Sequence, residues 1–292
     1  MLLLSFIFAH LIADFYLQTN KMVENKKKYI ALHMIHHFIC LSFVVFIFWW
    51  VRFDFQNIFT YAIFPIIFLL STHLFIDLGK IHIENSKMLK KYRKPSFDLL
   101  IFLLDQLLHM VFLTITCIWF YDDSLSIMYR KIKSLLLTNN TMDFPANLIF
   151  IAIVFIVTTT VCGHIISKVL GNLSLAISTF EGRYAFKNEI NDDRINNKRS
   201  NNQGMTEEYS FMIVNKDNLN RGRMIGYIER LLVLILTYYS SFSAIAFIIT
   251  AKSITRFKQM DDRNFAEYFL LGTLLSILFG IMIGLFVKAI IH

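Results

Sequence analysis

The sequence predicts an all-α protein, a polytopic membrane helix bundle with about seven transmembrane helices and a four-helix core at the N-terminus. Composition is the first reason: the chain of 292 residues is 56% hydrophobic and 15% aromatic, with a mean hydropathy of +0.54. These values are typical of integral membrane proteins. The second reason is that the apolar residues gather in runs of about 20, the length that crosses a bilayer as a helix.

The apolar runs give the expected spans. The first is interpreted as a retained span and not a cleaved signal, because Asp14 and Gln18 stand where the small residues of a cleavage site would lie. For the sixth run, over 224–250, a single span is preferred to a re-entrant hairpin that turns near Ser240, Ser241 and Ser243. The seven runs are 1–18, 29–51, 59–79, 97–121, 146–170, 224–250 and 267–291.

The spans divide the chain into regions. A short amphipathic stretch around Ile127 to Leu137 is expected to lie on the membrane surface. The expected regions are a four-helix membrane domain over 1–121, an extracytoplasmic loop over 122–145, a fifth span over 146–170, a partly disordered cytoplasmic loop over 171–223 with a short strand left open at 209–214, and a C-terminal two-span region over 224–292.

Basic residues set the expected orientation. Residues 19–28 contain four lysines and residues 80–95 contain six basic residues, whereas the loop 52–58 between them contains one arginine. By the positive-inside rule the N-terminus lies outside and both basic loops face the cytoplasm, in the inner membrane of the cell. The net charge of +8 is thereby assigned to topology and to anionic lipid, and no nucleic-acid partner is expected. A single span over 224–250 conflicts with the rule, because it places the four basic residues of 251–266 outside.

Four of the spans each carry a pair of metal-ligand-type residues one helical turn apart. Positions i and i+4 share a helix face, so each pair forms a polar stripe on an apolar helix. Ionisable groups inside a membrane mark a functional site by default. The first three pairs are expected at similar depths in the cytoplasmic leaflet, and the fourth somewhat deeper unless residues 96–99 project beyond the hydrocarbon. The pairs are His10 and Asp14, His33 and His37, His73 and Asp77, and Asp105 and His109.

This set of side chains predicts a metal site. Imidazole and carboxylate together suit Zn, Mn or Fe, and the lack of thiolates argues against a purely structural zinc site. Because helix bundles build dinuclear centres from facing His and carboxylate pairs, all eight residues are predicted to bind a divalent transition metal, with a dinuclear site as one option. Asp14, Asp77 and Asp105 are the candidate catalytic groups, one of them left free as general base. A proton or ion relay and structural hydrogen bonding between helices are the alternatives.

The leading functional hypothesis is a membrane-embedded, metal-dependent hydrolase whose site opens to the cytoplasmic leaflet, where a lipid or lipid-linked phosphoester would be its substrate. The first alternative is a proton or divalent-cation transporter or channel that uses the same residues. The second is a membrane effector or scaffold without catalysis, such as a stress or phage-defence component. The expected partners are the lipid bilayer and a lipid substrate, and a homo-oligomer is left open. Cys40, Cys117 and Cys162 are expected to be inert residues of the spans.

Several motifs resemble a known family. Three segments are similar to the bacterial membrane family of domain of unknown function 3307. They are AHLIADFYLQ at 9–18, HLFIDLGK at 73–80 and LLDQLLHM at 103–110. Three segments of the rear part of the chain resemble the longer members of this family. They are GRMIGYIERLLVLIL at 222–236, FSAIAFIITAKSITRF at 242–257 and AEYFLLGTLLS at 266–276. The resemblance implies an integral-membrane architecture and no particular activity. A second likeness, in the helical His and Asp pairs alone, is to bacterial membrane-bound metal-dependent hydrolases, although this chain lacks their early His-Arg pair.

Overall fold

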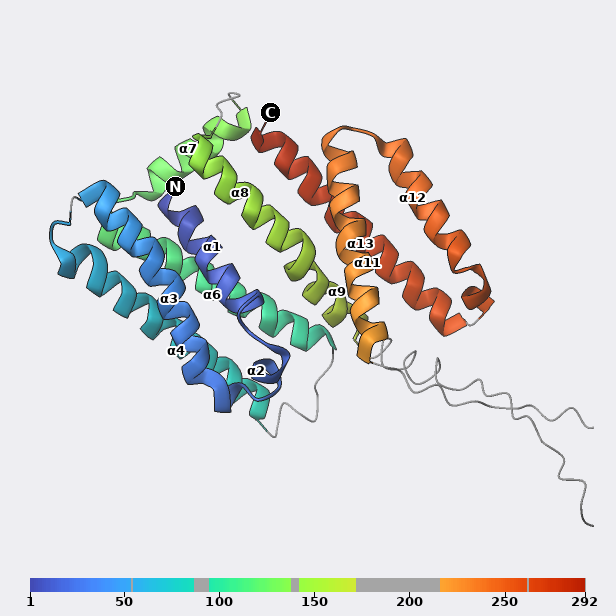
Figure 1. Cartoon of the computed structure of the whole chain (residues 1–292), viewed down its shortest axis with the longest axis horizontal. Helices are drawn as coiled ribbons and strands as arrows, with labels where there is room; N and C mark the ends of the chain where they lie inside the picture. Colours follow the sequence, from blue (N-terminus) through green and yellow to red (C-terminus); the bar gives the residue numbers. More distant parts are fainter. Residues whose placement is uncertain (54, 87–94, 138–141, 172–215, 262, 292) are drawn as a thin grey trace, which may run out of the picture.

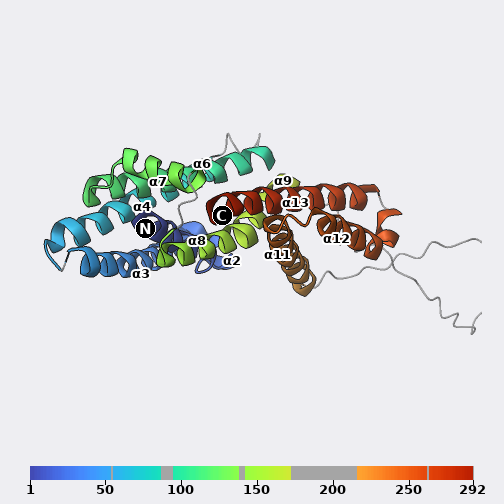
Figure 2. The ribbon, with the colours of Figure 1, turned by 90° about the horizontal axis from the view of Figure 1, so that it is seen from above.

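The computed structural model describes residues 1–53, 55–86, 95–137, 142–171, 216–261 and 263–291, and all regular secondary structure in these residues is helical. Figure 1 shows two groups of helices side by side, and Figure 2 shows the same ribbon from above. The front bundle comprises residues 1–137 and the rear helices comprise residues 142–291. The predicted all-α bundle is confirmed. Most of the cytoplasmic loop expected over 171–223, with its open strand at 209–214, lies outside the described residues, but residues 216–223 are helical and not part of a loop.

The front bundle is built from four long helices. They are joined by two short elements at the ends of the bundle, and a surface helix follows them. The four helices are α1 (Leu2–Phe15), α3 (Lys26–Phe53), α4 (Phe64–Asn85) and α6 (Pro95–Tyr121), and the other elements are α2 (Asn20–Glu24), the π-helix η1 (Phe59–Ile63) and α7 (Leu125–Leu137).

The rear helices form a continuous span followed by three helices that alternate in direction along the chain (Figure 1). α8 packs against α1 and α9 against α6, which joins the rear helices to the front bundle. The elements are α8 (Phe144–Ile156), the π-helix η2 (Val157–Val161), α9 (Cys162–Leu170), α11 (Lys216–Tyr238), α12 (Phe242–Thr255), the short 3-10 helix η3 (Phe257–Asp261) and α13 (Arg263–Ile291).

Five helical segments in the described residues are long and apolar enough to cross a membrane, which indicates a membrane protein. The first predicted span is shorter than expected, because α1 has 14 residues and is therefore about 21 Å long. The predicted count of seven spans stays a prediction. The five segments are Lys26–Phe53, Phe59–Asn85, Ser96–Tyr121, Phe144–Leu170 and Phe265–Ile291.

The preferred single helix over 224–250 is wrong, and the chain forms a hairpin there. α11 ends at Tyr238 and α12 begins at Phe242 (Figure 1). Ser240 adopts a left-handed conformation with φ 58°, its N–H donates to the Thr237 carbonyl, and the Ser241 N–H donates to the Leu236 carbonyl. This is the hydrogen-bond pattern of a Schellman C-cap, with serine at the position that glycine usually takes. The hairpin returns the chain after α12 to the end of the bundle where α11 begins.

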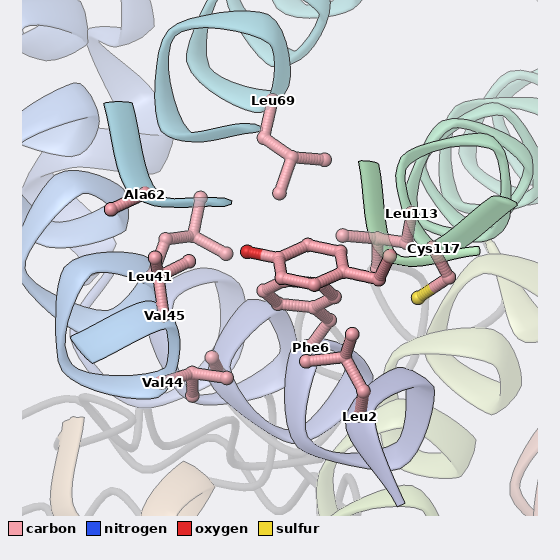
Figure 3. Close-up of a cluster of buried hydrophobic side chains, with 11 residues drawn as sticks. Leu2, Phe6, Leu41, Val44, Val45, Ala62, Leu69, Leu113 and Cys117 are labelled. Atoms are coloured by element: carbon pink, nitrogen blue, oxygen red, sulfur yellow. The ribbon is translucent and has the colours of Figure 1, made fainter. Parts of the chain in front are cut away.

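An apolar core fills one end of the front bundle. Phe6 of α1, Val45 of α3 and Cys117 of α6 are completely buried in it. Figure 3 shows these side chains converging with those of Leu41, Leu69 and Leu113 from three helices. Because four helices contribute to one core, their registers are fixed relative to one another, and the faces that carry the polar pairs are held in the same register.

Each half of the molecule contains a π-helix in which backbone carbonyl groups accept hydrogen bonds from a distant side chain. In the front bundle Pro65 has no N–H to donate to the Tyr61 carbonyl four residues earlier, and the Tyr121 hydroxyl donates to that carbonyl at 2.8 Å. In the rear helices the Arg230 guanidinium donates to the carbonyls of Thr158 and Thr159 at 2.7 and 2.8 Å. Both donors are buried, so these bonds satisfy polar groups that water does not reach.

α13 approaches α11 closely along a stripe of glycine. A Cβ atom at Gly284 would lie 2.7 Å from the Thr237 Cβ, and one at Gly280 would lie 2.7 Å from a methyl group of Val233. Glycine four residues apart on an apolar helix is the pattern that lets two membrane helices pack backbone against backbone. Gly280 and Gly284 therefore set the spacing of α11 and α13.

Candidate metal centre

The eight residues of the four polar pairs meet inside the front bundle, in two layers one helical turn apart. Each helix contributes one residue to each layer. The mouth layer consists of Asp14, His33, Asp77 and Asp105, which line a cavity at one end of the bundle. The inner layer consists of His10, His37, His73 and His109, which line a second cavity with apolar neighbours such as Leu41, Leu69 and Phe112.

The inner layer is a compact group of four buried imidazoles. Their exposed fractions range from 1% for His37 to 4% for His73 and His109. The ring centroids of His37 and His73 are 3.7 Å apart, those of His73 and His109 are 4.2 Å apart, and those of His10 and His109 are 4.8 Å apart. Such a group of imidazoles in an apolar bundle presents several nitrogen lone pairs to the same small space.

Asp14 lies at the centre of the cluster, and its two carboxylate oxygens face different residues. Oδ1 is 2.8 Å from the Nε2 of His37 and 3.4 Å from the Nε2 of His33. Oδ2 is 3.6 Å from the Nε2 of His10 and accepts a hydrogen bond from the Gln106 amide at 3.1 Å. One carboxylate thus connects two groups of imidazoles.

Asp77 lies on the other side of His33. Its Oδ2 is 3.3 Å from the Nε2 of His33 and 3.4 Å from the Nε2 of His73. The Nε2 atoms of His33 and His73 are themselves 3.2 Å apart. The Asp77 side chain is 18% exposed, against 11% for Asp14, so Asp77 is the more accessible of these two carboxylates.

Several polar atoms of the cluster have no hydrogen-bond partner among the described residues. They are the Nε2 of His10, the Nδ1 of His33, both ring nitrogens of His109 and the Oδ1 of Asp105. A buried polar group without a partner costs about 1–3 kcal/mol. Each neutral imidazole has one lone pair beside its N–H, so these residues bring together lone pairs that a bound cation would satisfy.

Three overlapping sets of residues have ligand atoms within 4.8 Å of one another, and each set could hold a metal ion. The first two share only Asp14, which offers a different oxygen to each. The third draws His73 and His109 from the other two, so it cannot be filled when both of those are filled. The sets are Asp14, His33, His37 and His73; His10, Asp14 and His109; and His73, Asp77 and His109.

Asp105 differs from the other seven predicted ligands. It belongs to none of the three sets, and its Oδ2 accepts hydrogen bonds from the Lys80 ammonium group and, at 3.3 Å, from the Gln106 amide. Its side chain is 4% exposed. The structure therefore places Asp105 beside the cluster as the partner of a lysine, and its predicted role as a ligand stays a prediction.

Sequence reasoning missed Lys80 and Gln106 as members of the site. A signal for Lys80 was present, because it stands three residues after Asp77 and seven after His73, on the same helical face. Gln106 stands three residues before His109. Both side chains bridge neighbouring helices, so their contacts depend on how α4 and α1 pack against α6.

Asp105 and His109 do not lie deeper in the bundle than the other pairs, which is the case that the sequence allows when residues 96–99 project beyond the hydrocarbon. They occupy the same two layers as the rest. The reason is that α6 begins at Pro95, so that about 15 Å of helix precede Asp105, whereas α1 ends one residue after Asp14. The early end of α1 also leaves room for the cavity below Asp14.

The other polar residues of the spans lie outside the cluster. His36 is adjacent to His37 on another face of α3, and the His164 Nδ1 makes a hydrogen bond with the Thr160 carbonyl at 2.9 Å. Glu229 accepts a hydrogen bond from Lys252 at 2.6 Å. The Glu229–Lys252 contact ties α11 to α12, whereas the His164 contact stays within one helical segment, and among the described residues none of these side chains belongs to a metal-ligand set.

The fold and the site define the front bundle as a helical membrane domain with a buried His/Asp cluster of metal-ligand type. Residues 2–137 match the family model described as protein of unknown function, DUF3307, which supports the resemblance of this part of the chain to that family. No curated protein and no solved structure matches the chain. The family match ends at α7, so the resemblance of the motifs at 222–276 to longer members stays a prediction.

Proposed function

We propose that the protein is a membrane-embedded, metal-dependent hydrolase whose active site is the His/Asp cluster of the front bundle. The observation that carries this proposal is the convergence of seven ligand-type side chains with several buried lone pairs that have no partner among the described residues. If the cluster had only a structural role, these buried nitrogen and oxygen atoms would have no partner, and the free energy of folding would be less favourable.

The proposed centre would hold two ions of Zn, Mn or Fe, and Asp14 would contribute a ligand to each position. His33, His37 and His73 complete the first position, and His10 and His109 complete the second. The Asp14 carboxylate suits this role because its Oδ1 faces the first group and its Oδ2 faces the second. The second position has only three protein ligands, which leaves coordination sites for water and substrate.

Bound ions would lower the pKa of a coordinated water and polarise the substrate. Asp77 is then the carboxylate left over, since it belongs to neither of the first two sets. It lies at the cavity and is more exposed than Asp14. We assign it the role of general base, which removes the proton of the attacking water.

The proposed location is the inner membrane, with the N-terminus outside and the mouth layer in the cytoplasmic leaflet. The hairpin of α11 and α12 supports this orientation, because it returns the basic loop after α12 to the side where α3 begins with three lysines. In a cysteine-free background, Lys27→Cys and Arg256→Cys should both be labelled from the cytoplasmic side only. Labelling of Arg256→Cys from the opposite side would contradict the proposed topology.

At that depth a lipid or lipid-linked phosphoester is the proposed substrate. The test is metal analysis of the purified full-length protein, followed by hydrolysis of phosphoester lipids in nanodiscs. The wild type and the control His36→Ala should hold about two equivalents of transition metal and release product, and His73→Ala should lose metal and activity together. Wild-type protein without metal would refute the proposal. Metal-dependent ion flux without product would favour the transporter alternative.

A further inference from the structure

Two lysines stand at the mouth of the cluster, and they have no role in binding metal. Lys80 and Lys26 line the same cavity as Asp14, Asp77 and Asp105, and this cavity has a volume of about 410 Å³ when its open mouth is included. The side chain of Lys80 is 14% exposed and that of Lys26 is 24% exposed, so both are partly buried at the cavity. The cavity thus combines ligand carboxylates with two cations.

We infer that this mouth is a phosphate subsite, in which Lys80, assisted by Lys26, binds the phosphate group of the substrate. The inference rests on the proposed function, and it adds the residues that bind the phosphate group of the proposed phosphoester. A lysine ammonium group has three N–H donors and acts on phosphate as a compact point charge. Lys80 donates to Asp105 and Lys26 lies 3.8 Å from Glu84, so each has donors left for a substrate oxygen.

Charge balance supports an anionic substrate. The three aspartates of the cluster and Lys80 together carry two negative charges when the histidines are neutral. Two divalent cations would reverse this to an excess of two positive charges in a largely buried space. Charges buried in a low-dielectric environment have to be compensated. A hydroxide together with a phosphate oxyanion would compensate them, whereas a neutral ester or amide would not.

The walls of the cavity indicate where the rest of the substrate lies. Beside the lysines the cavity is lined by Met22, Ile30 and Ile81, so the phosphate position adjoins an apolar wall. This combination suits a phosphate attached to an apolar alcohol. The shared chemistry is the phosphate group, and it would come either from a lipid headgroup or from a soluble phosphoester.

The experiment measures metal content and phosphate binding on the same full-length samples in nanodiscs. Inorganic phosphate is the first probe, and phosphatidic acid in phosphatidylcholine nanodiscs is the second. Lys80→Gln should keep the metal and weaken phosphate binding by about 10-fold to 100-fold, the effect of losing one charged hydrogen-bond donor. Lys80→Arg should restore most of the affinity. The control Lys27→Gln removes the same charge from an exposed lysine of α3 and should change nothing.

The double variant Lys80→Gln with Asp105→Asn guards against misfolding, because it leaves no buried carboxylate unpaired. It should fold, hold metal and show the same loss of phosphate binding. Wild-type phosphate affinity in the metal-loaded double variant and in Lys26→Gln would overturn the subsite and leave the metal centre standing. Absence of metal from the wild type would overturn both. Stronger binding of phosphatidic acid than of inorganic phosphate would identify the source as a lipid.

Discussion

The front bundle and the rear helices both bury polar side chains among apolar helices, but they satisfy them in different ways. In the rear helices the buried Arg230 donates to two backbone carbonyls of the π-helix η2. In the front bundle five imidazoles and Asp14 face mainly one another, and several of their polar atoms have no partner among the described residues.

This difference separates a structural polar group from a functional one. Unpartnered atoms also occur in the described rear helices, on Asn147, Thr158 and Thr273, but each is a single uncharged oxygen on a different element. In the described part of the front bundle His36 and Ser42 each have one such atom, and the other five converge in the His/Asp cluster. The comparison teaches that convergence of unsatisfied ligand atoms, more than burial of polar residues, is the sign of a binding site in this molecule.

The largest expected effect comes from Asp14, the residue shared by two ligand sets. Asp14→Ala should abolish binding at both metal positions, because each loses one carboxylate oxygen. His10→Ala should remove one ion and keep the other, since it belongs to one set only. Metal analysis of both variants distinguishes these outcomes. Loss of a single equivalent in Asp14→Ala would show that this carboxylate does not serve both positions.

Arg230→Ala should have a large effect on stability and none on metal content. The substitution leaves the carbonyls of Thr158 and Thr159 without their donors in a buried position. We expect a loss of about 3 kcal/mol or more, since hydrogen bonds to charged groups contribute about 1.5–3 kcal/mol each. Thermal unfolding in detergent measures the loss, and metal analysis of the folded fraction provides the contrast with Asp14→Ala. Loss of metal in folded Arg230→Ala would mean that the two halves are not independent.

The residues of the candidate site could be predicted from the sequence more completely than the helix arrangement of the rear part. The four pairs follow the helical period inside apolar runs, so position along the helix alone brings His10 above Asp14 and His73 above Asp77. The Lys80–Asp105 pair depends on the packing of α4 against α6, which no local pattern specifies. Asp105 and His109 share the two layers of the other pairs because of where α6 begins relative to the end of α1, and no local pattern specifies this.

The hairpin at Ser240 was harder to predict for a physical reason. The turn lies between two apolar helices and contains neither glycine nor proline, so a hydropathy window runs through it without a break. Its determinants are the left-handed Ser240 and a hydrogen bond of 2.6 Å from Lys288 of α13 to the Ser240 hydroxyl. A contact 48 residues away is a tertiary effect, and the cluster of serines was its only local sign.

Gly284→Ala should disturb the rear helices alone. The added Cβ would lie 2.7 Å from the Thr237 Cβ and 2.9 Å from the Leu234 carbonyl oxygen, so α13 would have to move away from α11. Overpacking of this kind costs about 1–3 kcal/mol. Gly222→Ala on α11 is the matched control, because a Cβ there meets nothing within 4 Å. A lowered thermal midpoint for Gly284→Ala at unchanged metal content is the expected result, and equal midpoints for the two variants would contradict the close contact.

Tyr121→Phe should produce the smallest of these effects, and it tests whether the front bundle also contains polar contacts of the purely structural kind. The substitution keeps the buried ring and removes the hydroxyl that donates to the Tyr61 carbonyl. That carbonyl then has neither the Pro65 N–H nor the tyrosine as donor, and we expect a loss of about 1–2 kcal/mol. Tyr239→Phe, at a residue that is 72% exposed, is the control and should leave the thermal midpoint unchanged. Metal content should stay at the wild-type value in both, because Tyr121 lies in the apolar core and not in the cluster. A fall in metal content with Tyr121→Phe would show that the π-helix at the start of α4 sets the position of His73 and Asp77, and the distinction between structural and functional polar groups would then not hold within the front bundle.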